Sequence, residues 1–165
     1  FNPTVARTMG MQNAWTVLKS GTASWDNYRA INTVFDARIG KWLAGDKLDD
    51  TIGEIDDSTA LHYGDIAQWI LYTPLMYLER MSLDEVEIGT IPGFTTYTGA
   101  NVACSITYDG IHYGSEWFEA YGDPAQYEKR FILRGLGYVR DIIGLRFRGA
   151  ARARMASARA RMPRS

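Results

Sequence analysis

The fold class is decided by the stretch Tyr108-Asp109-Gly110-Ile111-His112-Tyr113-Gly114-Ser115-Glu116-Trp117, in which an Asp-Gly pair lies between two runs of β-prone residues. Such a pair between strand-forming runs is the strongest short-range signal for a β-hairpin. We therefore expect two antiparallel strands, Val102–Tyr108 and Ile111–Glu119, joined at Asp109-Gly110.

The segment that follows this hairpin also has the composition of strands. Phe131–Leu133 and Tyr138–Phe147 are rich in aliphatic and aromatic residues, and Gly135-Leu136-Gly137 between them is expected to turn the chain. Three arginines stand among these residues: Arg130, Arg134 and Arg140. Since no phosphate-loop or metal-ligand spacing accompanies them, the pattern indicates antiparallel strands with one polar face and no active site.

Short strands are predicted earlier in the chain as well. Four of them recur at a spacing of about 12 residues, which is typical of a propeller blade or part of a sandwich: Asn13–Lys19, Tyr28–Asp36, Ile39–Asp46 and Asp49–Asp56. Residues 65–79 have some helical periodicity, but Thr73-Pro74 in their middle favours a long, broken strand. Leu83–Ile88 alternates apolar and acidic residues, which predicts a strand with one solvent-exposed face.

Length and composition fit one globular domain, or one domain with an appendage. The 165 residues are 46% apolar and 22% charged, which is incompatible with disorder throughout the chain. Aromatic residues at 13% and 16 glycines favour strands and tight turns. No window approaches the roughly 18 apolar residues that a membrane helix needs, and the first residues do not have the basic, apolar and small-residue pattern expected of a secretory leader. The first residue is Phe1, so we expect a processed product or a fragment.

Charge is distributed unevenly along the chain. Residues 142–165 contain seven arginines and no acid, which leaves 11 Lys and Arg against 19 Asp and Glu in residues 1–141, a formal charge of −8. The composition after Gly149 shifts to Ala, Arg and Met, so residues 150–161 are predicted to form a short helix that Pro163 ends. Six residues are candidates for docking on a partner: Arg152, Arg154, Met155, Arg159, Arg161 and Met162.

Three interpretations of this basic tail remain open. It fits docking on an acidic groove of a partner protein, with Met155 and Met162 one heptad apart as anchors. It also fits proximity to DNA phosphates, or a solvated helix with no partner. The absence of interleaved aromatic residues gives no support to base stacking.

No catalytic, metal or cofactor site is predicted. The acidic run from Asp46 to Asp57 lacks the EF-hand pattern and is interpreted as solvated turns. His62 and His112 stand at no metal-ligand spacing, and Ser115, His112 and Asp109 lack a nucleophile elbow. The lone cysteine, Cys104, fits a buried strand thiol better than a catalytic thiolate. The carboxylates Glu79, Asp84, Glu85 and Glu87 are interpreted as outward strand positions.

An ordered series of segments resembles one protein family. The segments are Phe35-Asp36-Ala37-Arg38-Ile39-Gly40-Lys41-Trp42-Leu43-Ala44-Gly45-Asp46, Thr51-Ile52-Gly53-Glu54-Ile55-Asp56, Tyr63-Gly64-Asp65, Tyr108-Asp109-Gly110 with Trp117, and Tyr127-x-x-Arg130-x-x-x-Arg134-x-Leu136-Gly137-x-x-Arg140-Asp141. Over about residues 25–148, the chain resembles the C-terminal part of the packaged-DNA-stabilization proteins of short-tailed bacteriophages, which are tail hub or head-completion proteins. The Ala/Arg tail beyond Gly149 lies outside this pattern.

The resemblance implies a structural protein of the virion. Its fold would be all-β and antiparallel: the last blades of a β-propeller (residues 1–63), a β-sandwich-like C-terminal part (64–148), and the basic tail with its short helix (149–165). The protein would close the portal channel, retain packaged DNA and attach tail parts in the phage tail or neck, after assembly in the host cytoplasm. The implied partners are the portal or adaptor ring, other hub subunits in a homo-oligomeric ring, and the tail needle or fibres, with packaged DNA close by.

A second hypothesis comes from the aromatic residues. A ligand- or glycan-binding β-sandwich module, such as an adhesin or fibre domain, would need a concave aromatic site. Trp42, Trp69 and Trp117 are the candidates for it.

Overall fold

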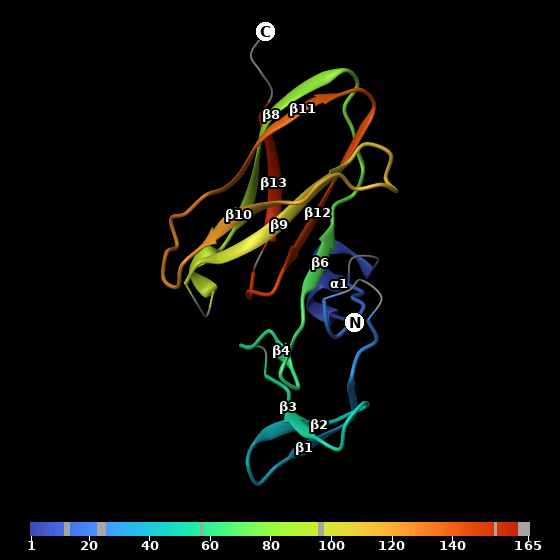
Figure 1. Cartoon of the computed structure of the whole chain (residues 1–165), viewed down its shortest axis with the longest axis vertical. Coiled ribbons are helices and arrows are strands. Elements are labelled where there is room, and N and C mark those ends of the chain that lie inside the picture. The colour runs from blue at the N-terminus through green and yellow to red at the C-terminus, as the bar shows by residue number, and fades with distance from the viewer. Residues whose placement is uncertain (12–13, 23–25, 57, 96–97, 154, 162–165) are drawn as a thin grey trace. The chain divides into compact units, whose positions relative to one another are not determined.

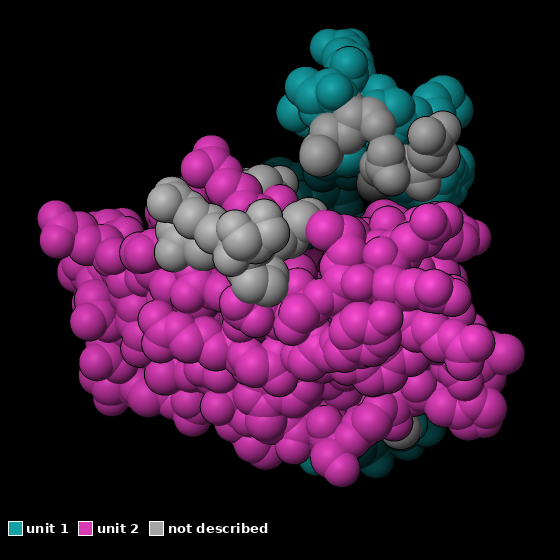
Figure 2. All heavy atoms as spheres, turned by 90° about the horizontal axis from the view of Figure 1, so that it is seen from above, with its two compact units in different colours: residues 1–55, 62–67 teal, residues 56–61, 68–165 magenta. Residues whose placement is uncertain are grey.

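The computed structural model describes all residues except 12–13, 23–25, 57, 96–97, 154 and 162–165. The chain divides into two compact units, one of residues 1–55 and 62–67 and the other of residues 56–61 and 68–165, which Figure 2 distinguishes by colour. Antiparallel strands make up nearly all of the regular structure, which confirms the predicted fold class. In the described part of the chain, no helix is long and apolar enough to cross a membrane.

The first unit opens with a helix that the sequence analysis missed. Helix α1 spans Pro3–Met9, and the side chain of Asn2 caps it by accepting hydrogen bonds from the backbone N–H groups of Thr4 (3.0 Å) and Val5 (3.2 Å). Asn before Pro at the first helical position is a common helix start. The strand predicted at residues 13–19 is wrong over residues 14–19, which form no strand, and Asn13 lies outside the described residues.

The main sheet of the first unit has three strands. Its order is β1-β2-β3, and all pairs are antiparallel. The strands are β1 (Ala30–Asp36), β2 (Lys41–Asp46) and β3 (Ile52–Glu54), followed by the short ladder of β4 (Leu61–His62) with β5 (Asp65–Ile66). These elements match three of the four predicted short strands.

One arginine holds the first unit's loops together. Arg29 donates from Nε to Asp46 (3.0 Å) and from Nη1 to Asp65 (2.5 Å), and its Nη2 also pairs with Asp46. The hydrogen bonds from Arg29 hold the pKa of Asp46 below its usual range. Asp46 is 8% exposed, so the interpretation of the acidic run as solvated turns is wrong at this residue.

The second unit is a sandwich of two sheets, shown in Figure 1. One sheet has the order β10-β9-β12-β6, with β7 also pairing β12, and the other has the order β11-β8-β13. Their strands are β6 (Trp69–Tyr72), β7 (Met76–Tyr77), β8 (Met81–Thr90), β9 (Ala100–Thr107), β10 (Trp117–Gly122), β11 (Phe131–Val139), β12 (Ile142–Gly149) and β13 (Met155–Arg161), with the 3-10 turn η2 (Pro92–Phe94) after β8. The breaks between β5, β6 and β7 agree with the interrupted strand predicted over residues 65–79.

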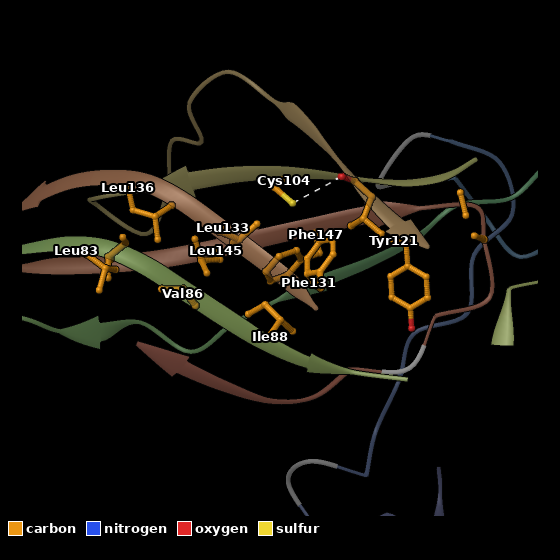
Figure 3. Close-up of a cluster of buried hydrophobic side chains, with 14 of the residues drawn as sticks. Leu83, Val86, Ile88, Cys104, Tyr121, Phe131, Leu133, Leu136, Leu145 and Phe147 are labelled. Carbon is orange, nitrogen blue, oxygen red and sulfur yellow. Dashed lines mark hydrogen bonds between the residues drawn. The ribbon is translucent and has the colours of Figure 1, made fainter. Parts of the chain in front are cut away.

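The core of the second unit lies between these two sheets. Alternate residues of the strands point inward, as Figure 3 shows for Val86 and Ile88 of β8, Leu133 of β11, and Leu145 and Phe147 of β12. Leu133 is completely buried, and Leu145 and Phe147 are each 1% exposed. Both sheets therefore bury their apolar faces within this unit.

The predicted hairpin pairs the expected strands, but its connection is long. Trp117 of β10 lies opposite Cys104 of β9, so residues 108–116 form a loop instead of a two-residue turn. Asp109 shapes this 108–116 loop by accepting from the backbone N–H groups of Ile111 (2.8 Å) and His112 (2.7 Å). Because Asp109 bonds to the backbone ahead of it, the Asp-Gly signal marks a side-chain-supported turn within the loop.

The turn predicted at residues 135–137 is also wrong. Strand β11 runs through this segment with a register shift between Arg134 and Gly137, and the chain reverses at Arg140 and Asp141 instead. Gly135 (φ 68°) and Gly137 (φ 80°) adopt left-handed conformations that favour glycine. The two glycines therefore form a β-bulge, which keeps Leu136 buried.

Strand β13 replaces the predicted C-terminal helix. It pairs with β8 from Met155 opposite Thr90 to Arg161 opposite Glu85. Helix propensity is weak for a segment this short and is overridden when an unpaired strand edge can satisfy its backbone hydrogen bonds. The edge of β8 provides that partner, so the Ala/Arg composition forms a strand here.

Candidate docking surface

The candidate docking residues of the tail do not form a helix face. Met155 begins β13 and packs against the core of the second unit, and Arg159 is exposed near its other end. Arg152 precedes the strand, with its guanidinium carbon 6.0 Å from the centre of the Phe94 ring. Arg161 is the last residue of β13, whereas Arg154 and Met162 lie outside the described residues. The heptad anchoring of Met155 and Met162 is wrong, because it required a helix.

Strand β13 instead brings arginines beside two carboxylates of β8. The register sets Arg159 opposite Glu87 and Arg161 opposite Glu85. From the other side of β8, Arg134 of β11 lies opposite Glu85. We use the name arginine ladder for six residues of this sheet: Arg130, Arg134, Glu85, Glu87, Arg159 and Arg161.

The geometry of the ladder is best defined on the β11 side. Arg130 binds Glu87 through two parallel hydrogen bonds, Nε to Oε1 (2.7 Å) and Nη2 to Oε2 (2.6 Å). Hydrogen bonding to Glu87 raises the pKa of Arg130 further above its ordinary value. Arg134 donates from Nε to Glu85 at 3.4 Å. Both side chains are more than half exposed, so the ion pairs add little stability.

The ladder has more positive than negative charge. It has four arginines and two carboxylates, and Arg130 contacts both oxygens of Glu87. The excess of positive charge lies on a sheet face where Arg130, Arg134 and Arg159 are exposed to solvent. This arrangement can attract a carboxylate- or phosphate-bearing partner. Sequence reasoning identified Glu85 and Glu87 as outward positions but missed their pairing, which depends on the strand register.

The aromatic residues of the glycan hypothesis have different environments. Trp69 of β6 is half-buried and donates its Nε1–H to the Ala151 carbonyl (2.7 Å). Trp117 of β10 is half-buried, packs against the core and lines an open cleft of about 470 Å³ with Tyr108 and Tyr113. Trp42 lies on β2 of the first unit. Two of the three tryptophans thus have structural contacts in the second unit, and this weakens the argument for a shared aromatic site.

The remaining candidates for chemistry have structural roles where they are described. The Ser20 hydroxyl and His62 Nδ1 are 2.8 Å apart, and burial lowers the pKa of His62. Asp109 and His112 form an exposed pair at 2.6 Å, and no contact joins them to Ser115 among the described residues. Burial raises the pKa of Cys104 to about 12, so its thiol is protonated at neutral pH. No metal-binding cluster of three or more His, Cys, Asp or Glu occurs in the described part of the chain.

Comparison with known proteins gives three findings. Residues 68–164 match the family model described as the β-sandwich of bacteriophage P22 Gp10, and residues 1–60 match the model described as its β-propeller. The tail hub protein gp10 of Salmonella phage P22 is 28% identical to this chain over 134 residues, which is 81% of this chain and 28% of that protein. The chain therefore spans less than a third of the length of this curated relative.

Proposed function

The chain belongs to the bacteriophage P22 Gp10 family, and from this membership we propose that it is a structural part of a tail hub in the virion of a short-tailed phage. The observation that carries the proposal is the order of the two matches, a propeller model over residues 1–60 and a sandwich model over residues 68–164. In this role, the hub closes the portal channel, retains packaged DNA and attaches tail parts. No turnover is expected of it.

The first unit has the surface expected of a blade that packs against neighbours. Several large apolar residues of its three-stranded sheet are more than one-third exposed: Ile31, Val34, Phe35 and Trp42. Exposed apolar area of this extent is unusual for a free surface and is typical of an interface. We propose that neighbouring propeller blades cover these side chains in the assembled hub.

The arginine ladder and the tail provide a second contact in this proposal. We propose that Arg152, Arg154, Met155, Arg159, Arg161 and Met162 belong to the surface that meets a neighbouring virion protein. A partner with an acidic surface suits the excess positive charge of the ladder. Packaged DNA is the alternative anion, and the two are distinguished by whether binding of duplex DNA to the purified chain depends on Arg159 and Arg161.

The proposal is tested in the phage particle. Virions assembled without this polypeptide should package DNA and then lose it, so their DNA becomes sensitive to nuclease while DNA in wild-type particles stays protected. Electron cryomicroscopy of wild-type particles should place the sandwich in the tail, next to the portal. Absence of the chain from purified virions by mass spectrometry, or full DNA retention without it, would contradict the proposal.

A further inference from the structure

The outer face of the second unit's larger sheet carries a cluster of charge beside exposed aromatic rings. The strand registers align Phe118, Ala103, Arg148 and Ile70 in one row across β10, β9, β12 and β6. The neighbouring row sets Ser105 beside Arg146 and Tyr72. We use the name arginine–aromatic face for Arg146, Arg148, Glu116, Phe118, Tyr72 and Tyr113.

Two guanidinium groups on this face share one carboxylate. Glu116 accepts from Nη2 of Arg146 (3.2 Å) and from Nη2 of Arg148 (2.5 Å). Arg146 also donates to the Ser105 hydroxyl (3.0 Å), and Arg148 donates to Gln68 (3.1 Å). The three charged side chains are 24–30% exposed, so the net positive charge of this cluster is only partly screened by water.

The hydrogen-bonding capacity of Arg148 is incomplete. Its Nε–H is buried and has no partner among the described residues. An incoming carboxylate cannot reach this enclosed nitrogen, so the exposed parts of the two guanidinium groups would contact it. Arg146 and Arg148 share the single carboxylate of Glu116, and the positive charge left over favours binding of one further carboxylate.

Aromatic side chains flank the charged cluster and are available for contact. Phe118 is 68% exposed and Tyr72 is 50% exposed. Tyr113 packs edge-to-face against Tyr72 at 5.7 Å, and the Arg146 guanidinium lies 4.6 Å from the centre of the Tyr113 ring. Arg and Tyr beside an exposed Phe have the composition of a protein-interaction hot spot. The face therefore fits a segment that offers a carboxylate next to apolar side chains.

One segment of the same chain has this chemistry. The loop between β2 and β3, together with the first residue of β3, exposes Leu48 (69%) and Ile52 (76%), with the exposed carboxylate of Asp50 between them. We propose that the arginine–aromatic face binds the Leu48–Ile52 loop of a second copy of this chain. Phe118 would contact the apolar side chains of the loop, and Arg148 would bind the carboxylate of Asp50. A contact between two different surfaces propagates from copy to copy and closes a ring when the rotation allows.

This inference rests on the proposed hub function, in which several copies meet, and it is tested on the purified 165-residue chain. Sedimentation velocity over a range of concentrations should show self-association of the wild-type chain that weakens as NaCl is raised. Phe118→Ser, Arg148→Glu and Asp50→Lys should each weaken association at least about tenfold. Phe118→Ser is the variant least able to disturb folding, because its side chain is mostly exposed.

Two matched controls lie outside both surfaces. Arg140→Glu and Asp141→Lys reverse exposed charges at the β11–β12 turn and should leave association unchanged. An equimolar mixture of Arg148→Glu and Asp50→Lys chains should recover association, since one partner keeps an intact face and the other an intact loop. Docking within a single chain would give no recovery on mixing and would overturn the inference.

Other outcomes separate this inference from the hub proposal. A wild-type chain that stays monomeric, or Phe118→Ser and Asp50→Lys chains that associate like the wild type, would overturn the contact. The hub proposal would stand in either case, because the location of the protein in the virion is measured independently.

Discussion

In the second unit, burial determines the pKa of the Cys104 thiol. Cys104 is 1% exposed within the core, and its Sγ has the Val102 carbonyl 3.7 Å away (Figure 3). Burial is the main cause of its raised pKa, followed by the charges of Glu119 and Glu116. The sequence alone predicted a buried strand thiol here, because Cys104 stands in an apolar run.

The first prediction concerns the reactivity of this thiol. Cys104 should not react with a thiol reagent at pH 8 in the native protein and should react fully in guanidinium chloride, because access to the thiolate requires unfolding. The measurement is the time course of reagent absorbance, with Cys104→Ala as the control. Rapid reaction of the native chain would show that the core opens around β9.

The second prediction concerns how the stability of the 108–116 loop depends on pH through Asp109. Its hydrogen bonds, first with the His112 side chain and then with the backbone N–H groups of Ile111 and His112, hold the pKa of Asp109 well below its usual range. The folded pKa is thus lower than the unfolded value of about 3.9, so this stabilisation is present above about pH 4 and is lost as the pH falls toward the folded pKa.

This pH effect is measurable in the loop itself. On acidification below pH 4, the protection of the Ile111 and His112 amides against hydrogen exchange, corrected for the intrinsic pH dependence of exchange, should fall. Asp109→Asn should remove this dependence while leaving the core signals in place. An identical titration in the Asn variant would contradict the role of Asp109.

At the scale of elements, local signals located most strands but not all their ends. Asp109-Gly110 and Gly135-Leu136-Gly137 both resemble turns, yet the first lies within a long loop and the second within a strand. Residues such as Asp and Gly indicate a local backbone conformation. The position at which the chain reverses depends instead on which residues of the paired strands must be buried. The predicted C-terminal helix failed for a similar reason, since β13 pairs with the edge that β8 offers.

The β-bulge supplies a prediction for β11. A Cβ at Gly137 would meet no atom within 4 Å, but its φ of 80° makes any side chain strained. Gly137→Ala should therefore destabilise the protein by about 1–2 kcal/mol. Gly114→Ala is the control, since φ is not positive there and the nearest atom is at an ordinary 3.6 Å. Chemical denaturation measures the free energy of unfolding of both variants, and equal values for the two would contradict the role of backbone strain.

At the scale of the whole molecule, the two units differ in how much of their apolar surface they bury. The second unit has a continuous core contributed by both of its sheets. The first unit leaves large apolar residues exposed on its three-stranded sheet. The resemblance to a family predicted a blade-like part followed by a sandwich-like part, whereas composition and periodicity alone left the two architectures as alternatives.

This contrast gives a prediction for separated fragments. Residues 68–165 expressed alone should unfold cooperatively in denaturant, because their core is complete. Residues 1–67 alone should show a broad transition and bind a hydrophobic dye, because three strands with exposed apolar side chains are marginally stable in water. Circular dichroism and dye fluorescence measure both, and a sharp transition in residues 1–67 would contradict the interpretation of that unit as a partial fold.

The bulge in β11 also has a mechanical consequence. It leaves the carbonyl of Leu136 as the acceptor for the Tyr108 hydroxyl, at 2.9 Å, and Tyr108 directly follows β9 of the opposite sheet. A tensile force on the 108–116 loop is therefore shared by the two layers, which must shear together until this bond breaks. Replacing the Tyr108 hydroxyl with hydrogen would uncouple the layers at that end and lower the force at which the sandwich yields.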